Sequence, residues 1–229
     1  MSVKEYYEQY WQDGRLDGCP HIVWKKDILL SDVQIDLNGC IYDYGCGNGE
    51  IGGEFVNKCK VYGFDISSVA LDNAKARGLL SDADYHGKYD VVFLLDILEH
   101  LFDIDDIMGI VLDRVKEGGN IYISVPNGVN LYNRLMFLMG NPVDLNDRAH
   151  KYNDMWSEHI RVFTLKVLRE LCRVNGLRIV KEWYYFPHKL TEKSGLIYSC
   201  VHKAVNFFRL HQVFPSLFAL GFMVKCIKK

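Results

Sequence analysis

One stretch of the sequence decides the fold: Ile41-Tyr42-Asp43-Tyr44-Gly45-Cys46-Gly47-Asn48-Gly49. An apolar start, an acid and three glycines at alternate positions are typical of a buried strand that runs into a tight loop. Glycine lets the backbone adopt positive φ angles and lets a ligand approach the main chain closely. A helix N-terminus after such a loop offers free N–H groups to a cofactor. Taken alone, the loop fits a cofactor site and an ordinary turn equally well.

Strands and helices alternate after this loop. The predicted strands cover 40–44, 60–64, 79–85, 89–95 and 120–125, and the helices between them cover 49–58, 67–77 and 104–115. A further helix at 163–175, strands at 177–186 and 216–227 and an apolar helical stripe at 197–208 follow. The near-continuous apolar run at 89–95 is typical of a strand covered on both faces. This alternation predicts an α/β fold with a doubly wound, mainly parallel, Rossmann-like sheet.

An acid at the end of the second predicted strand supports a nucleotide-like cofactor. Asp65 is placed to accept hydrogen bonds from two ribose hydroxyls, while the glycine loop approaches the rest of the ligand. The dinucleotide fingerprint G-x-G-x-x-G is not matched, because the third glycine comes one position early. Asp43 would repel a pyrophosphate and attract a cationic amine or sulfonium. The residues therefore favour S-adenosylmethionine over NAD, and an NAD-linked oxidoreductase is the weaker alternative.

Four blocks of the sequence resemble the class I S-adenosylmethionine-dependent methyltransferases. The blocks are Asp43-Tyr44-Gly45-Cys46-Gly47-Asn48-Gly49, Gly63-Phe64-Asp65-Ile66-Ser67, Tyr89-Asp90-Val91-Val92-Phe93-Leu94-Leu95-Asp96-Ile97-Leu98-Glu99-His100 and Ser124-Val125-Pro126-Asn127. The last two blocks and the later His159-Ile160-Arg161-Val162-Phe163-Thr164 resemble the small-molecule methyltransferase subgroup. The resemblance implies a seven-stranded sheet whose C-terminal strand is antiparallel.

The resemblance also implies a cofactor site. Its residues are Asp43, Gly45, Cys46, Gly47, Asp65, Ile66, Asp82, Ala83, Leu95 and Asp96. In such a site Asp43 holds the amino group, Asp65 binds both ribose hydroxyls and Ile66 packs on adenine. Asp82, with the backbone of Ala83, is the best match for the acid that reaches the adenine amine. The last two residues of the set line the methionine end.

Catalytic and acceptor-binding candidates follow from the chemistry. Methyl transfer from a sulfonium is a direct displacement, so the protein mainly positions the nucleophile and excludes water. A hydroxyl acceptor benefits from a general base, and the candidates are His100, His159 and Glu158. Each of the three also has a structural interpretation, as a cap, an internal contact or a surface acid. Candidate acceptor contacts are Asn127, Tyr132, Arg134, Trp156 and Arg161, of which an arginine would suit a phosphate or carboxylate.

Composition narrows the class of protein. The 229 residues carry a formal charge of −2, which disfavours a nucleic-acid partner. Seven cysteines without a C-x-x-C pair support neither a zinc site nor a disulfide framework, and reduced thiols suggest a cytoplasmic protein. The apolar run at 217–224 is shorter than the ~20 residues that span a bilayer. We expect no metal, no stable membrane insertion, and a monomer or homodimer.

We interpret residues 1–229 as a single methyltransferase domain. It would comprise an N-terminal helical cap (1–37), a cofactor-binding half (38–126), a substrate-covering insertion (127–160) and C-terminal helices and strands (161–229). The predicted activity is S-adenosylmethionine-dependent methyl transfer to an O or N atom of a small molecule, for example a sugar or a biosynthetic intermediate. The alternatives are a non-catalytic S-adenosylmethionine-binding partner protein, and a methyltransferase acting on a lipid-linked acceptor through the 197–208 helix.

Overall fold

The structure is a computed structural model that describes residues 2–12, 20–140, 159–187 and 196–228. The strands are β1 (Cys40–Tyr44), β2 (Lys60–Phe64), β3 (Leu80–Ser81), β4 (Tyr89–Leu95), β5 (Val115–Pro126), β6 (Leu177–Tyr185) and β7 (Gly221–Lys228). The helices are α1 (Val3–Gln12), α2 (Pro20–Asp32), α3 (Ser68–Ala76), α4 (Ile104–Arg114), α5 (Leu131–Leu138), α7 (Leu165–Val174), α8 (Leu196–Phe207), α9 (Leu210–Val213) and α10 (Pro215–Phe218). Three short 3₁₀ turns are η1 (Gly52–Phe55), η2 (Asp82–Asp84) and η3 (Leu98–His100).

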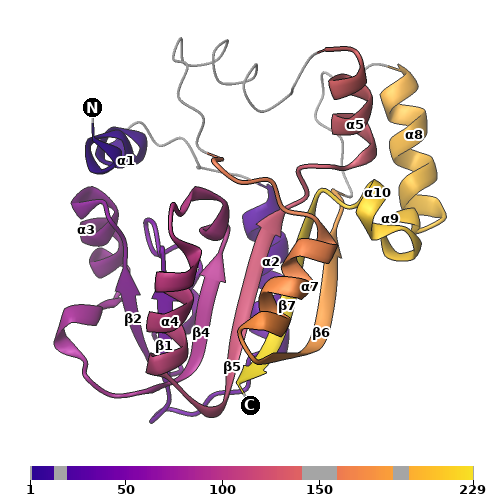
Figure 1. The fold of residues 1–229 in the computed structure, drawn as a ribbon. Coiled ribbons are helices and arrows are strands. Elements are labelled where there is room, and N and C mark those ends of the chain that lie inside the picture. The colour runs from indigo at the N-terminus through magenta and orange to yellow at the C-terminus, as the bar shows by residue number, and fades with distance from the viewer. Residues whose placement is uncertain (1, 13–19, 141–158, 188–195, 229) are drawn as a thin grey trace.

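The strands within the described residues form one seven-stranded sheet in the order β3-β2-β1-β4-β5-β7-β6 (Figure 1). β1 pairs in parallel with β2 and β4, and β4 pairs in parallel with β5. β7 runs antiparallel to both of its neighbours, β5 and β6. The predicted fold, a doubly wound and mainly parallel sheet with an antiparallel C-terminal strand, is therefore confirmed.

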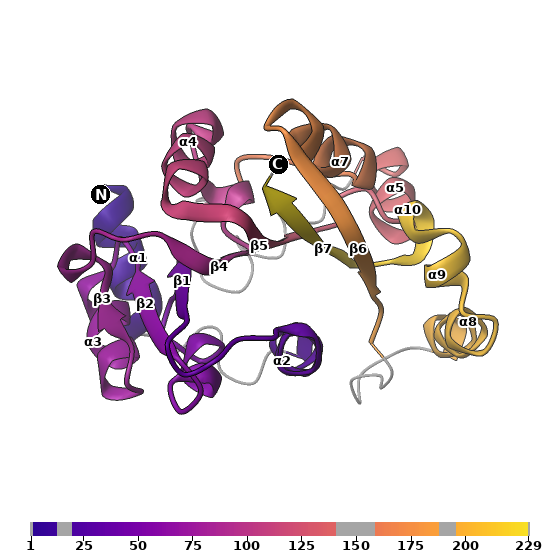
Figure 2. The ribbon, with the colours of Figure 1, turned by 90° about the horizontal axis from the view of Figure 1, so that it is seen from below.

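Helices cover both faces of the sheet (Figure 2). α4 and α7 pack on one face, where Met108 and Leu168 are fully buried against strand residues. α2, α3 and η1 pack on the other face, where Leu29 and Phe55 are buried. Every residue of β1 is buried, and this includes Asp43, a charged side chain placed at the carboxyl end of the strand. The core thus holds the strand ends in fixed register and leaves a carboxylate there.

The predicted boundaries fail where local sequence breaks the regular pattern. The predicted helix at 49–58 is only η1, because Gly49 has a positive φ of 75° and two more glycines follow at the start of the turn. The predicted strand at 79–85 is only β3, followed by η2. The start of the predicted strand at 216–227 is α10, whose first residue is Pro215, a residue favoured at that helix position.

Segments outside the sheet form the surroundings of its carboxyl edge. α1 lies beyond this edge, above α3 (Figure 1). Of the predicted insertion at 127–160, the structure describes α5 and its flanks, while 141–158 lie outside the described residues. None of the described helices combines the length and the apolar composition needed to cross a membrane.

Candidate functional site

A cavity of about 680 Å³ opens at the carboxyl ends of β1, β2, β4 and β5. Its walls come from the glycine loop, the end of β2, residues 95–97 and 99–101, and side chains of α1 and α2. Parallel sheets of this topology bind ligands at this edge, where the direction of strand order reverses. We call this space the cavity below.

The glycine loop forms the floor of the cavity and requires its glycines. Gly45 and Gly47 have positive φ angles of 76° and 52°. The backbone N–H groups of Gly45 and Cys46 donate to the carbonyl of Phe64 at 2.7 and 3.0 Å, which fixes the loop to the end of β2. A Cβ on Gly47 would lie 2.4 Å from the ring of Trp11 in α1. The loop is therefore closed by α1 as well as shaped by its own glycines.

Asp65 joins the loop to the N-terminus of α3. One carboxylate oxygen accepts from the Gly47 N–H at 2.9 Å and the other accepts from the Ser67 N–H at 3.0 Å. Burial raises the pKa of Asp65, while these backbone donors oppose the shift. Because a carboxylate offers about four acceptor sites, both oxygens keep capacity for hydroxyl donors in the cavity.

Asp43 is 3% exposed at the end of β1. Burial, aided by the nearby charge of Asp65, raises the pKa of Asp43 to about 7, and a hydrogen bond from the Gly52 backbone opposes this shift. A buried carboxylate with little compensating positive charge favours a cationic ligand. Asp43 is thus suited to hold an ammonium or sulfonium group.

Asp96 at the end of β4 binds a cation from another part of the chain. Its φ is 50°, an unusual value for a residue other than glycine. Ser124 donates to one carboxylate oxygen at 2.7 Å, and the buried ammonium of Lys25 in α2 pairs with the other. Burial opposes ionisation, but the charges of Lys25 and His21 hold the pKa of Asp96 at about 2. This pair anchors α2 over the cavity.

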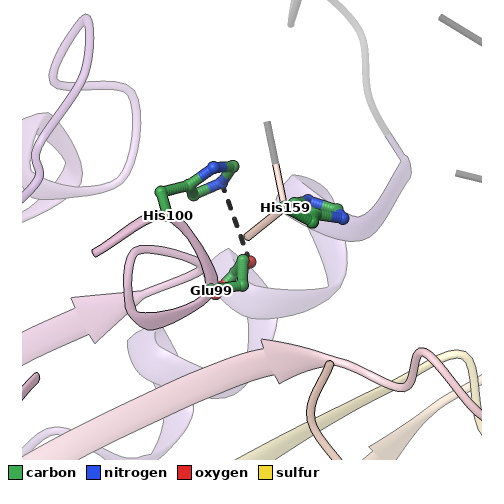
Figure 3. Close-up of side chains that lie close together, drawn as sticks. All are labelled: Glu99, His100 and His159. Atoms are coloured by element: carbon green, nitrogen blue, oxygen red, sulfur yellow. Dashed lines mark ion pairs between the residues drawn. The ribbon is translucent and has the colours of Figure 1, made fainter. Parts of the chain in front are cut away.

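His100 and His159 meet at the cavity wall beside Glu99 (Figure 3). Glu99 and His100 lie in η3, directly after β4, and His159 comes from a distant part of the chain. The ring centroids of the two histidines are 5.0 Å apart. The structure therefore brings together two of the predicted catalytic candidates, whereas the third, Glu158, lies outside the described residues.

α1 is fixed over the cavity by a side-chain cap. The Glu8 carboxylate accepts hydrogen bonds from the Ser67 and Ser68 hydroxyls and from the backbone N–H groups of Ser68 and Val69, at 2.8 to 3.0 Å. These donors lower the pKa of Glu8 to about 2. Free N–H groups at the α3 N-terminus are thereby satisfied by another helix. We call this contact the Glu8 cap.

Eight of the ten predicted cofactor residues line the cavity, namely Asp43, Gly45, Cys46, Gly47, Asp65, Ile66, Leu95 and Asp96. Asp82 and Ala83 are not among its lining residues. Arg114 binds both carboxylate oxygens of Asp82 at 2.6 Å, and the Tyr89 hydroxyl donates at 2.6 Å. The short β3 leaves Asp82 within reach of α4, so the structure gives Asp82 a packing role.

Four candidate acceptor contacts lie within the described residues, and none of them lines the cavity. They are Asn127, Tyr132, Arg134 and Arg161. The buried Asn127 amide donates to the carbonyl of Ala219 at 2.8 Å, and the guanidinium groups of Arg134 and Arg161 donate to backbone carbonyls. Tyr132 is 51% exposed on α5. Trp156 lies outside the described residues. The asparagine and the two arginines thus satisfy backbone carbonyl groups, as polar side chains in loops often do.

Sequence reasoning missed several residues of the cavity. Lys25, Trp11 and Tyr7 come from the predicted N-terminal helical cap, for which no individual site residue was predicted. Glu99 lies in the third methyltransferase-like block, but its sequence position alone predicts no role for it. The available signal was an acid and a histidine side by side directly after a strand end, where parallel sheets place their ligands.

Comparisons with known proteins agree with this geometry. A family model described as a methyltransferase domain matches residues 24–182, more than half of the chain. The ubiquinone biosynthesis O-methyltransferase of Marinobacter nauticus is 29% identical over 170 residues, covering 66% of this chain and 71% of that relative. The protein of the same name from Escherichia coli is 29% identical over 102 residues, covering 38% of this chain and 42% of that relative.

Solved structures share the fold at low identity. A chain from the complex between the Haloferax volcanii Trm112 methyltransferase activator and a methyltransferase matches with a TM-score of 0.66 at 15% identity, covering 99% of both chains. Magnesium protoporphyrin IX methyltransferase from Synechocystis, solved with bound S-adenosylhomocysteine, matches with a TM-score of 0.55 at 14% identity, covering 100% of this chain and 89% of that one.

The chain therefore belongs to this methyltransferase family. It is an S-adenosylmethionine-dependent enzyme, and S-adenosylmethionine is its cofactor. The expected superfamily is thereby confirmed, and the NAD-linked alternative is not supported.

Proposed function

We propose that the enzyme transfers the methyl group of S-adenosylmethionine to a hydroxyl oxygen of a small organic molecule. The single observation that carries this proposal is the meeting of His100, His159 and Glu99 at the wall of the cofactor cavity. A hydroxyl acceptor loses its proton on methylation and benefits from a group that assists this loss, whereas a neutral amine attacks a sulfonium without such a group. The names of two relatives, which are O-methyltransferases, support an oxygen acceptor.

The cofactor would lie along the carboxyl edge of the sheet. Asp43 would hold the amino group of its methionine part, and Asp65 would bind the ribose hydroxyls with the oxygen lone pairs that its backbone donors leave free. Ile66 and Phe64, which line the cavity and are 45% and 38% exposed, would pack against adenine. The glycine loop would then hold the methionine end of the cofactor, and His100 and His159 line the same cavity.

The protein would act mainly by positioning the two reactants and excluding water, and not by forming a covalent intermediate. The acceptor oxygen would attack the methyl carbon while its proton passes to water or to a cavity histidine, and the carbon–sulfur bond would break with its electron pair going to sulfur, which releases S-adenosylhomocysteine. Aligning the two reactants in a closed site accounts for much of the acceleration in reactions of this type. α1 supports closure, because the Glu8 cap and the ring of Trp11 fix it above the loop.

The test is an acceptor screen with the full chain. Purified protein is incubated with S-adenosylmethionine and a matched panel of phenols, alcohols and amines, and methylated products are identified by mass spectrometry. We expect O-methylated products, and we expect variants His100→Ala and His159→Ala to lose turnover while keeping affinity for S-adenosylhomocysteine. Methylation of amines alone, or no product with any acceptor while cofactor still binds, would contradict the proposal. The latter result would favour a non-catalytic partner.

A second candidate, a lipid-linked acceptor, rests on exposed apolar side chains. Phe137 and Leu138 of α5 are 73% and 81% exposed, and Phe207 and Phe208 at the end of α8 are 80% and 64% exposed. Both helices lie at the β6 end of the sheet (Figure 1). Exposed aromatic and aliphatic side chains of this kind suit an interfacial helix. Turnover that rises when an alkylated acceptor is presented in vesicles, and falls in Phe207→Ser/Phe208→Ser, would support this acceptor class.

A further inference from the structure

Three side chains at the acceptor end of the cavity form a cluster of possible metal ligands. The ligand atoms offered by Glu99, His100 and His159 all lie within 4.8 Å of one another. His100 Nε2 is 3.9 Å from Glu99 Oε1, and Figure 3 shows both imidazole rings flanking the Glu99 carboxyl group. Histidine nitrogens and carboxylate oxygens bind zinc at about 2.0 to 2.2 Å. Small side-chain rotations would therefore bring all three onto one ion.

Glu99 carries an unmet requirement for positive charge. It is 1% exposed, and its Oε2 atom has no hydrogen-bond donor among the described residues. The nearby Lys25 ammonium is already paired with Asp96. A buried carboxylate oxygen without a partner is costly, and a bound cation is one way in which proteins satisfy it.

Neighbouring contacts hold the two histidines in a ligand-like arrangement. The Tyr7 hydroxyl lies 3.1 Å from His100 Nδ1, which directs the opposite nitrogen, Nε2, toward Glu99. The carbonyl of Glu99 accepts from the backbone N–H groups of Ile160 and Arg161 at 3.0 and 3.3 Å, so the segment that carries His159 is tied to η3. Metal-binding histidines usually have their second nitrogen oriented by such an outer contact.

The separation within the cluster favours a metal site over a simple acid–base pair. At 3.9 Å, His100 Nε2 and Glu99 Oε1 are too far apart for a hydrogen bond of the kind that orients a catalytic histidine. Two nitrogens and one carboxylate oxygen suit zinc and the neighbouring transition ions, whereas magnesium and calcium prefer sites made of oxygen alone. Three protein ligands also leave at least one position open, as in catalytic zinc sites.

We propose that Glu99, His100 and His159 bind one divalent transition-metal ion, with zinc the best fit, whose open position faces the acceptor. The inference deepens the proposed function and runs against the sequence-based expectation of a metal-free enzyme. The ion would coordinate the acceptor hydroxyl, which then releases its proton to water more readily. The oxygen would attack the methyl carbon as the carbon–sulfur bond breaks. The products are the methyl ether, S-adenosylhomocysteine and one proton, and the ion is not consumed.

Metal binding can be measured without any acceptor. Protein stripped with a chelator and dialysed is titrated with Zn²⁺ against a chromophoric competitor, and with Co²⁺ while visible absorption is recorded. We expect one equivalent to bind, with Co²⁺ bands that Zn²⁺ displaces. Glu99→Gln and His159→Ala should each weaken binding by about tenfold or more. The control His86→Ala, which removes an exposed histidine distant in sequence from the cluster, should not change it.

The outcomes separate this inference from the proposed function. S-adenosylhomocysteine affinity and thermal unfolding show whether each variant is folded, and the partly exposed His159 provides a variant that disturbs the core less than Glu99 does. Affinity in His159→Ala equal to that of His86→Ala, or Co²⁺ binding without visible bands, would overturn the metal site. Turnover that persists with chelator would also overturn it, while leaving O-methylation intact. Saturable metal binding without O-methylation would instead support the site and contradict the proposed function.

Discussion

The cofactor end of the cavity and the acceptor end are built from different parts of the chain. The cofactor end comes from two consecutive strand–loop units, β1 with the glycine loop and β2 with Asp65. The acceptor end joins η3, the segment at His159 and side chains of α1 and α2. The cofactor end is a local motif, whereas the acceptor end is formed by segments that are distant in sequence. One half of this site is therefore specified by short stretches of sequence, and the other half depends on tertiary packing.

The largest expected effect lies at the cofactor end. Asp65→Ala removes the carboxylate that we propose as the acceptor for the ribose hydroxyls, and it also releases the Gly47 and Ser67 N–H groups. Because hydrogen bonds to a charged group contribute about 1.5 to 3 kcal/mol each, we expect affinity for S-adenosylhomocysteine to fall by roughly a hundredfold or more. Calorimetric titration measures this loss, and Asp72→Ala, at an exposed acid of α3, is the control. Unchanged affinity in Asp65→Ala would show that the cofactor binds elsewhere.

The same contrast explains what could be predicted from the sequence. The bounds of β1, β2 and β4 follow from apolar runs that end at turn residues, and Asp43 and Asp65 follow from their places at strand ends. The pairing of Lys25 with Asp96 and the approach of His159 to His100 depend on how distant helices and loops dock. Asp82 does not line the cavity, because the short β3 leaves it within reach of Arg114, a contact that no local pattern reveals.

The second expected effect is a pH dependence at Asp43. Burial raises the pKa of Asp43 from its usual 3.8 to about 7, so the ligand-free protein holds this carboxyl largely neutral below pH 7. Affinity for S-adenosylhomocysteine, whose amine is cationic, should rise by up to about tenfold per pH unit toward pH 7 and then level off. Binding measured by calorimetry between pH 5.5 and 8.5 tests this.

Protein stability should change in the opposite direction. Between about pH 4 and pH 7 the unfolded chain has released the Asp43 proton while the native state keeps it, so the free energy of unfolding of the ligand-free protein falls with rising pH. Asp43→Asn should flatten both the binding and the stability profiles in this window. A wild-type profile as flat as that of Asp43→Asn would refute the role given to this carboxyl.

A smaller effect is expected where α1 meets the glycine loop. Gly47→Ala places a Cβ 2.4 Å from the Trp11 ring and puts alanine at a φ of 52°. The left-handed conformation costs roughly 1 to 2 kcal/mol for a residue other than glycine, so affinity should fall about tenfold. Adding Trp11→Ala to this variant should recover only the part of the affinity loss that is due to the clash with the Trp11 ring. Gly109→Ala in α4, where nothing beyond the adjacent residues and the helix's own backbone lies within 4 Å of the added Cβ, should leave affinity unchanged.

The smallest effect tests whether α1 links the two ends of the cavity. Glu8 joins α1 to the cofactor end at α3, while Tyr7 joins the same helix to His100 at the acceptor end. Glu8→Ala should speed dissociation of S-adenosylhomocysteine by a few fold, about the change expected from one exposed charged contact. Stopped-flow displacement measures this rate.

Glu5→Ala is the matched control, since Glu5 lies on the same helix and accepts a hydrogen bond from the Ser2 N–H at 2.6 Å, within the N-terminal segment. Ionisation sets the pH window of the Glu8 cap. The pKa of Glu8 is lowered to about 2 from 4.5, so the stabilisation is complete above pH 4.5 and is lost as pH falls toward 2. The difference between the two variants should therefore stay constant from pH 6 to 8. If Glu8→Ala and Glu5→Ala release the cofactor product at the same rate, α1 does not control closure, and the two ends of the cavity act independently.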